Sequence, residues 1–200
     1  MDFEDLVAVV AVAFTVVFAW PQVFRVLRHG IAGISVGAIT LSMVGAAAWL
    51  GYGIAEGLAP VIVANLGVMT GQLVVTIELV RHHALPRGRA AGAIAAGSAL
   101  VGLSQLGALT EPIVTVAGFV SIVSVVVQLV EVVREPHRLE GLSAGTYAIL
   151  AAVGSSWTVY GIVRGNAVII MTNLVVLPMA IFISWSSWRS HHEAATPEAV

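Results

Sequence analysis

Three aromatic or polar residues of the chain recur as a set at a constant distance along the sequence. Trp49, Tyr52 and Asn65 form the first set, and the same residue types stand 108 positions later. The second set is Trp157, Tyr160 and Asn173. An indole face can stack on the apolar C–H face of a sugar ring, and an amide both donates and accepts hydrogen bonds. The repeated set therefore predicts a site for a neutral, hydroxyl-rich solute, built by two equivalent halves of the chain.

The composition is that of a chain with lipid as its solvent. Of the 200 residues, 58% are hydrophobic and 10% are charged, whereas a soluble domain carries about 25% charged residues. The nine basic residues are all Arg, and the net charge of −2 gives no support for nucleic-acid binding. The chain has no Cys, no phosphate-binding or dinucleotide motif and no nucleophile elbow. We therefore expect no cofactor, no metal and no enzymatic activity.

Seven apolar stretches are long enough to cross a membrane as helices. They are approximately residues 5–27, 36–56, 58–80, 88–107, 112–133, 144–164 and 166–188. With the N-terminus outside, eight of the nine Arg residues fall on the cytoplasmic side and only Arg164 lies outside, which follows the positive-inside rule. We expect an all-α, multi-pass integral membrane protein with seven transmembrane helices and a cytoplasmic C-terminus, located in the cell membrane.

The recurring set belongs to a longer repeat of three helices. Residues 1–82 are expected to form the first three-helix bundle and residues 111–188 the second. Residues 83–110, rich in Ala and Gly, form a linker helix, and residues 189–200 are expected to be a disordered tail. Because three helices end on the side opposite to their start, the linker helix carries the chain back. The two bundles are then parallel, related by an axis along the membrane normal.

A Pro-Gln dipeptide near the inner end of the first helix is a further feature of the sequence pattern. Pro21-Gln22, the 3+1+3 order of helices and the paired Trp and Asn together resemble the SWEET sugar-transporter family, within the PQ-loop (MtN3-saliva) group. The resemblance covers nearly the whole chain and departs from the family pattern at Val127-Gln128, where a second Pro-Gln is expected. It implies a facilitative sugar transporter that works by alternating access around a site at the middle of the membrane.

The expected pocket also follows from depth. Trp49 and Asn65 lie on consecutive helices, each about 11 Å from the outer loop near Gly57 at 1.5 Å per residue. Trp157 and Asn173 would form the opposite wall, and the resemblance implies a sugar pocket at these four positions. The alternatives are a lipid-facing or interfacial Trp and an Asn that joins neighbouring helices.

The outer end of the pathway is expected to close with aromatic and charged residues. Tyr52 and Tyr160 lie one turn outward of the Trp pair, and Glu56 and Arg164 follow four residues later in their repeats. An acid and a base at equivalent positions could pair across the pore mouth, and the resemblance supports a gate of Tyr plus an ion pair. The alternative is two unpaired charges among the lipid headgroups.

The inner end shows a similar exchange of charge. Arg25 in the first repeat corresponds to Glu131 in the second, one turn beyond Gln22 and Gln128 respectively. We expect Arg25 and Glu131 to form an inner gate, although Arg28 and Arg134 could also pair with the acid. Pro21 removes a backbone hydrogen bond, so the first helix is expected to kink there, either as a hinge or as a static bend.

The mode of transport follows from the absence of acids at the midplane. Proton-coupled carriers usually need a titratable group inside the membrane, and the two Asp residues, Asp2 and Asp5, stand at the outer end of the first helix. We expect uniport of a small sugar, with the lipid bilayer as the surrounding medium. Two alternatives remain: a carrier of another neutral solute, such as an amino acid or a vitamin, and a non-transporting receptor or scaffold. The sequence is also compatible with a homo-oligomer.

Overall fold

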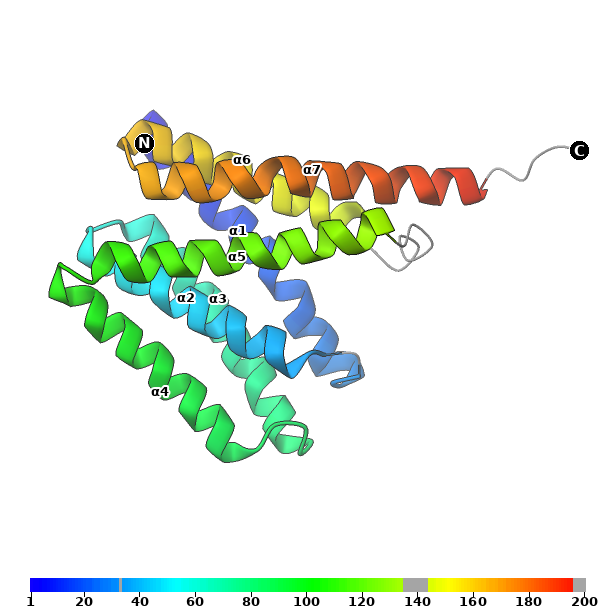
Figure 1. The fold of residues 1–200 in the computed structure, drawn as a ribbon, viewed down its shortest axis with the longest axis horizontal. Coiled ribbons are helices and arrows are strands. Elements are labelled where there is room, and N and C mark those ends of the chain that lie inside the picture. Colours follow the sequence, from blue (N-terminus) through cyan, green and yellow to red (C-terminus); the bar gives the residue numbers. More distant parts are fainter. Residues whose placement is uncertain (33, 135–143, 196–200) are drawn as a thin grey trace, which may run out of the picture. The chain divides into compact units, whose positions relative to one another are not determined.

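The described residues of this chain fold into helices (Figure 1). The computed structural model describes residues 1–200 except Gly33, residues 135–143 and residues 196–200. Seven α-helices and a short 3-10 turn follow in order: α1 (Phe3–His29), α2 (Val36–Ala55), α3 (Ala59–Arg81), α4 (Arg87–Leu103), η1 (Ser104–Leu106), α5 (Thr110–Arg134), α6 (Ala144–Arg164) and α7 (Ala167–Ala195). No strand occurs among the described residues, and the predicted all-α fold is confirmed.

Five of these helices are long and apolar enough to cross a membrane, namely α1, α2, α3, α6 and α7. In the described residues, α4 has 17 residues, and the apolar part of α5 covers Thr110–Val123. The length and composition of the five helices support an integral membrane protein. The seven spans and the outside N-terminus stay predictions.

Helix ends follow local sequence. At the start of α1, the Asp5 amide donates to Asp2 Oδ1 at 2.8 Å and the Asp2 amide donates to Asp5 Oδ2 at 3.2 Å. This reciprocal pair has the geometry of a capping box. At the start of α2, Ser35 Oγ accepts from the Ala38 amide at 3.2 Å, which satisfies one of the free amides of the first turn.

The C-terminal end of α7 corrects one expectation. The tail was predicted to be disordered from residue 189, and α7 instead continues to Ala195. Residues 189–195 contain neither Gly nor Pro, and the first helix-breaking residue after them is Pro197. The polarity of this stretch, from which disorder was predicted, does not by itself end a helix.

The chain divides into two compact units. Residues 15–118 form the first-repeat unit, and residues 1–14 together with residues 119–200 form the second-repeat unit. The helices α1 and α5 each contribute to both. The linker helix belongs to the first-repeat unit, and the first half of α1 belongs with the second repeat.

In the first-repeat unit, α4 runs parallel to α2 (Figure 1). Ala90, near the start of α4, shares a buried cluster with Ile39 near the start of α2. Further along, a Cβ built on Gly97 would lie 3.2 Å from Ala47 Cβ, and η1 lies against Gly51 near the end of α2. Small residues on both helices permit this close approach.

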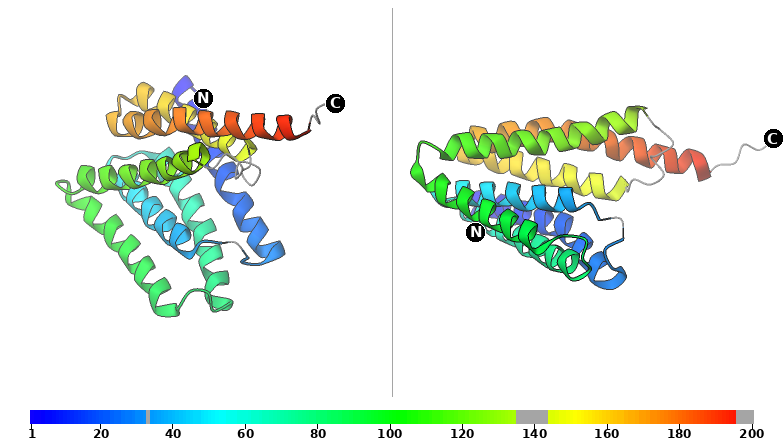
Figure 2. Two further views of the ribbon diagram at one scale, coloured as in Figure 1. Left: turned by 45° about the vertical axis from the view of Figure 1, so that its right-hand side comes forward. Right: turned by 60° about the horizontal axis from the view of Figure 1, so that its bottom comes forward.

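The helices α1 and α3 of the first-repeat unit also meet through glycine. A Cβ on Gly71 would lie 3.0 Å from Val23 Cγ2, and one on Gly67 would lie 3.4 Å from Val16 Cγ2. Gly67 and Gly71 form a G-x-x-x-G pattern, which lets two helix backbones approach in a membrane. In the second-repeat unit, α6 and α7 lie antiparallel along one another (Figure 2).

We predict that Gly51→Ala lowers the stability of the protein. The added methyl group would lie 2.6 Å from Ser104 Oγ and 3.1 Å from Val101 Cα, and overpacking of this kind costs about 1–3 kcal/mol. Thermal unfolding of the purified protein in detergent, followed by circular dichroism, measures the loss. Gly45→Ala is the matched control, because a methyl group there meets nothing within 4 Å. Equal unfolding temperatures for the two variants would contradict the packing of η1 on α2.

Candidate functional site

The second and third helices of each repeat are joined by the same turn. At the end of α2, the Leu58 amide donates to Gly53 O at 2.8 Å, and Gly57 has φ +65°. At the end of α6, the Asn166 amide donates to Gly161 O at 2.8 Å, and Gly165 has φ +63°. A hydrogen bond from an amide to the carbonyl group five residues earlier, with a left-handed glycine just before the amide, is a Schellman motif. The repeat seen in the sequence is thus a repeat of backbone geometry.

A second pair of glycines presses each turn against the following helix. A Cβ on Gly53 would lie 3.1 Å from Ile62 Cγ1 and 3.2 Å from the Ile62 amide nitrogen. A Cβ on Gly161 would lie 2.9 Å from Ile170 Cγ1 and 3.1 Å from the Ile170 nitrogen. Neither position has room for a side chain. Gly161 stands 108 positions after Gly53, but spacing alone does not reveal this packing role.

The aromatic residues of each repeat form an edge-to-face pair on one helix. The ring centroids of Trp49 and Tyr52 lie 5.9 Å apart at an interplanar angle of 90°. Those of Trp157 and Tyr160 lie 5.5 Å apart at 89°. Such pairs contribute about 0.5–1.5 kcal/mol beyond the area they bury. Both Tyr side chains are buried, so each Tyr helps to fix the orientation of the Trp one turn away.

The Asn side chains have the same local partner in both repeats. Asn65 Nδ2 donates to Val61 O at 2.8 Å, and Asn173 Nδ2 donates to Ile169 O at 2.9 Å. Val61 and Ile169, like the residues that follow them, lie against the paired glycines of the turn. Each amide is therefore held by its own helix, and both side chains are half-buried. Within the described part of the chain, neither Asn Oδ1 accepts a hydrogen bond from protein.

We call each Trp, Tyr and Asn set on its helix hairpin a half-site. The first half-site lies on α2 and α3 of the first-repeat unit, and the second lies on α6 and α7 of the second-repeat unit. In each of them, Trp and Asn stand eight residues to either side of the left-handed glycine. The two antiparallel helices therefore hold Trp and Asn at the same depth. The meeting of the two half-sites in one pocket stays a prediction.

Of the charges expected at the outer gate, Arg164 has a partner that the sequence did not suggest. Arg164 Nη1 lies 3.0 Å from Glu4 Oε1, with both side chains about two-fifths exposed. The pairing of Arg164 with Glu56 stays a prediction. Glu56 is the C-cap residue of α2 and is exposed. Glu4 belongs to the segment of α1 that completes the second-repeat unit, a long-range placement that sequence spacing does not reveal.

The residues expected at the inner gate are described only in part. Arg25 Nη2 donates to Ala32 O at 3.1 Å, so this side chain fastens the loop that follows α1. Pro21 and the neighbouring Gln22 are exposed, and α1 is continuous through the proline. The side chains of Gln128 and Glu131 lie outside the described residues. The pairing of Arg25 with Glu131 stays a prediction.

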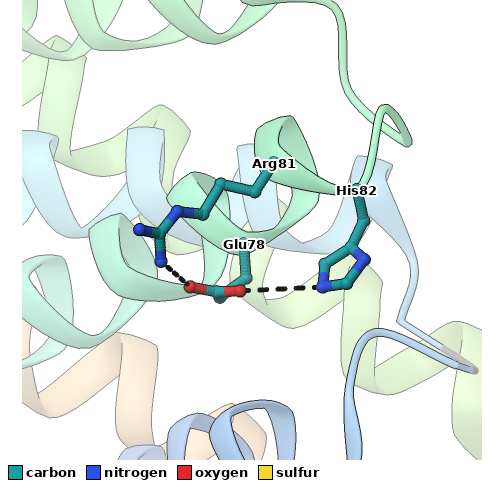
Figure 3. A network of polar contacts seen from close by, with 3 residues as sticks. All are labelled: Glu78, Arg81 and His82. Carbon is teal, nitrogen blue, oxygen red and sulfur yellow. Dashed lines mark hydrogen bonds and ion pairs between the residues drawn. The ribbon is translucent and has the colours of Figure 1, made fainter.

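The last turn of α3 carries a small polar network (Figure 3). Glu78 Oε1 lies 2.9 Å from Arg81 Nη1, and Glu78 Oε2 lies 3.7 Å from His82 Nε2. Arg81 is largely exposed, so the pair adds at most about 1 kcal/mol. Glu78 thus lies in the last turn of α3, and its partners are neighbouring residues of the same helix end.

Comparison with known proteins adds no relative. No protein-family model matches the chain, and a search of curated proteins found no match. The half-sites therefore have to be interpreted from their own geometry and from the sequence.

We predict a measurable coupling between Glu4 and Arg164 in a double-mutant cycle. Glu4→Gln and Arg164→Gln, alone and combined, should give a coupling free energy of about 0.2–1 kcal/mol that decreases with added salt. The measurement is unfolding in detergent at low and high ionic strength. The matched cycle replaces Glu4→Gln by Glu56→Gln and should show weaker coupling, because Glu4 is the partner that Arg164 contacts in this structure. Coupling to Glu56 with none to Glu4 would contradict the observed pairing.

Proposed function

We propose that this protein is a facilitative transporter of a small neutral sugar, a mono- or disaccharide. The observation that carries the proposal is the pair of half-sites with the same turn, the same aromatic pair and the same Asn geometry. A site used by two halves of one pathway needs this duplication, whereas a single structural Asn or Trp does not. Parallel repeats of this kind are known in transporters, where the solute site lies at the repeat interface.

The chemistry of the half-sites suits hydroxyl groups. With one Asn N–H bonded to its own helix, each side chain offers one acceptor oxygen and one remaining N–H to a solute. Because the amide is already held, little rotamer freedom is lost on binding. The indole faces would take the C–H faces of the sugar. No charged group belongs to either half-site, which favours an uncharged solute.

The placement of acids supports uniport. Every Asp and Glu within the described helices lies in a first turn, in a last turn or at a cap. These residues are Glu4, Asp5, Glu56, Glu78, Glu111, Glu131 and Glu193. A proton-coupled carrier needs a titratable group within the membrane. We therefore infer movement of solute down its own gradient.

Two packing features support a seven-span arrangement with the N-terminus outside. The Glu4–Arg164 pair supports an arrangement with the start of α1 and the end of α6 on one side of the membrane. In that arrangement, α4 and α5 would both cross or neither would. The parallel contact of α4 with α2, from Ile39 to Gly51, favours crossing by α4. The outer side then holds one Arg against eight on the cytoplasmic side.

Gating would use the asymmetric charges at the two ends. Arg164 would exchange Glu4 for Glu56 as the outer end closes over Tyr52 and Tyr160. An exposed ion pair contributes about 0–1 kcal/mol, so such an exchange costs little. On the inner side, Pro21 would allow α1 to bend, and Arg25 would pair with Glu131. Alternating access requires only that each gate opens when the other is shut.

We predict that Asn65→Ala and Asn173→Ala each reduce sugar flux at least tenfold, because each removes a hydrogen-bonding group from one half-site. The measurement is counterflow of labelled glucose and sucrose in liposomes, beside a panel of amino acids. Leu66→Ala is the matched control, since Leu66 is the next residue along α3 and is exposed. Amino-acid flux in place of sugar flux would support the rival carrier, and the absence of any flux would support a receptor or scaffold.

We also predict that reversing the charges of the inner pair restores transport. Arg25→Glu and Glu131→Arg should each lower counterflow several-fold, because each places like charges at the inner end. The double variant should recover most of the wild-type rate. A double variant no faster than either single variant would exclude the pairing. Arg28→Glu, which changes the same charge one turn away, controls for a loss of the positive-inside charge.

A further inference from the structure

The first-repeat unit contains a buried donor and a buried acceptor that have no partner. Among the described side chains, the fully buried polar atoms without a hydrogen bond are Trp20 Nε1 and Gln72 Oε1. Gln72 is only 8% exposed, and its amide nitrogen donates to Ser42 Oγ at 3.0 Å. Buried polar groups are nearly always hydrogen-bonded in folded proteins. The indole N–H of Trp20 and the amide oxygen of Gln72 both lack a hydrogen-bond partner, which requires an explanation.

The two atoms belong to one layer of the bundle formed by α1, α2 and α3. Val23, Ile39 and Val75 lie in a single buried cluster against which Trp20 packs. The residues Trp20, Ser42 and Gln72 each stand three positions outward of one cluster member, which is about 4.5 Å along the helix axis. The contact of Gly71 with Val23 brings α1 and α3 together at this level. Trp20 and Gln72 therefore stand at the same level on two neighbouring helices.

This layer lies inward of the first half-site on a shared helix face. Gln72 follows Asn65 by seven residues on α3, which is about two turns, or about 10.5 Å, and returns to nearly the same face. A solute that leaves Asn65 toward the inner end along this face would meet Gln72 as the next polar side chain. The layer is thus placed on the expected path of the solute.

The second repeat shows that the fold does not need a polar layer here. The positions equivalent to Trp20, Ser42 and Gln72 are Val126, Leu150 and Ala180. Leu150 packs against a buried hydrophobic cluster, and Ala180 is completely buried. The equivalent helices therefore carry apolar residues at this level. Helix packing at this level does not require the polar set of the first repeat.

We propose that Trp20 Nε1 and Gln72 Oε1 form a binding position for one hydroxyl group, inward of the first half-site. A hydroxyl accepts a hydrogen bond from the indole N–H and donates one to the amide oxygen. A carboxylate would be repelled by the amide oxygen, and an ammonium group would meet the indole N–H donor. The hydroxyl can come from the transported solute, which rests on the proposed function, or from a water molecule, which does not.

The test observes the Trp20 indole proton directly. Protein labelled with 15N-tryptophan is prepared in nanodiscs, and Trp20→Phe assigns the resonance among those of the five Trp residues. We expect a glucose or sucrose titration to shift the Trp20 resonance, and Gln72→Leu to abolish the shift. If water supplies the hydroxyl, the indole proton shows magnetisation transfer from water that Gln72→Leu removes and sugar does not change. Gln72→Met replaces Gln72→Leu if that variant does not fold.

The matched control is Met69→Leu, which changes the same face of α3 one turn outward without changing a polar group. It should leave the Trp20 resonance and its response unchanged. If a solute is the source, Trp20→Phe and Gln72→Leu should each raise KM for counterflow about two- to tenfold, as expected for one lost hydrogen bond. A Trp20 proton that contacts no water and responds to no sugar would overturn the proposal. If the wild-type protein transports no solute, the proposed transport function is rejected. The magnetisation transfer from water to the Trp20 indole proton would still show whether this position binds a hydroxyl group.

Discussion

The close contact between each half-site helix and the first turn of the next helix is the constraint on which the rest depends. It requires glycine at positions 53 and 161, because a Cβ at either would collide with backbone and side-chain atoms of the following helix. The contact fixes the turn, and the turn fixes the depth of Trp against Asn. The carbonyl groups of Val61 and Ile169, at this same contact, orient the Asn amides. One steric requirement thus positions the polar groups of both half-sites.

Most of the helical architecture could be predicted from hydrophobic length and from the repeat, because both are local properties of the sequence. The helices begin and end within a few residues of the expected bounds, except that α4 ends early in η1 and α7 extends to Ala195. The partner of Arg164 could not be predicted, since Glu4 lies 160 residues away and only the fold brings them together. The role of Gly53 and Gly161 and the unpaired atoms of Trp20 and Gln72 depend on packing, which spacing alone does not specify.

The two repeats agree at the outer turn and differ toward the inner end. The first repeat has the G-x-x-x-G contact of Gly67 and Gly71 with α1, the polar layer at Gln72 and the linker helix packed on α2. At the positions of Gly67 and Gly71 the second repeat has Val175 and Met179. Symmetry is kept where both halves would touch the same solute, and it is lost where each half has its own neighbours. A duplicated chain can diverge in this way without losing its shared site.

The division of the chain into units also sets an order of assembly. The first-repeat unit is a single continuous segment, residues 15–118, whereas the second-repeat unit joins residues 1–14 to residues 119–200. During synthesis, the continuous unit has all its residues while the last 82 are still to be made, and domains made first generally fold first. The start of α1 must then wait for α6 and α7 before Glu4 can reach Arg164. The contact between Glu4 and Arg164 is therefore made only after α6 has been synthesised.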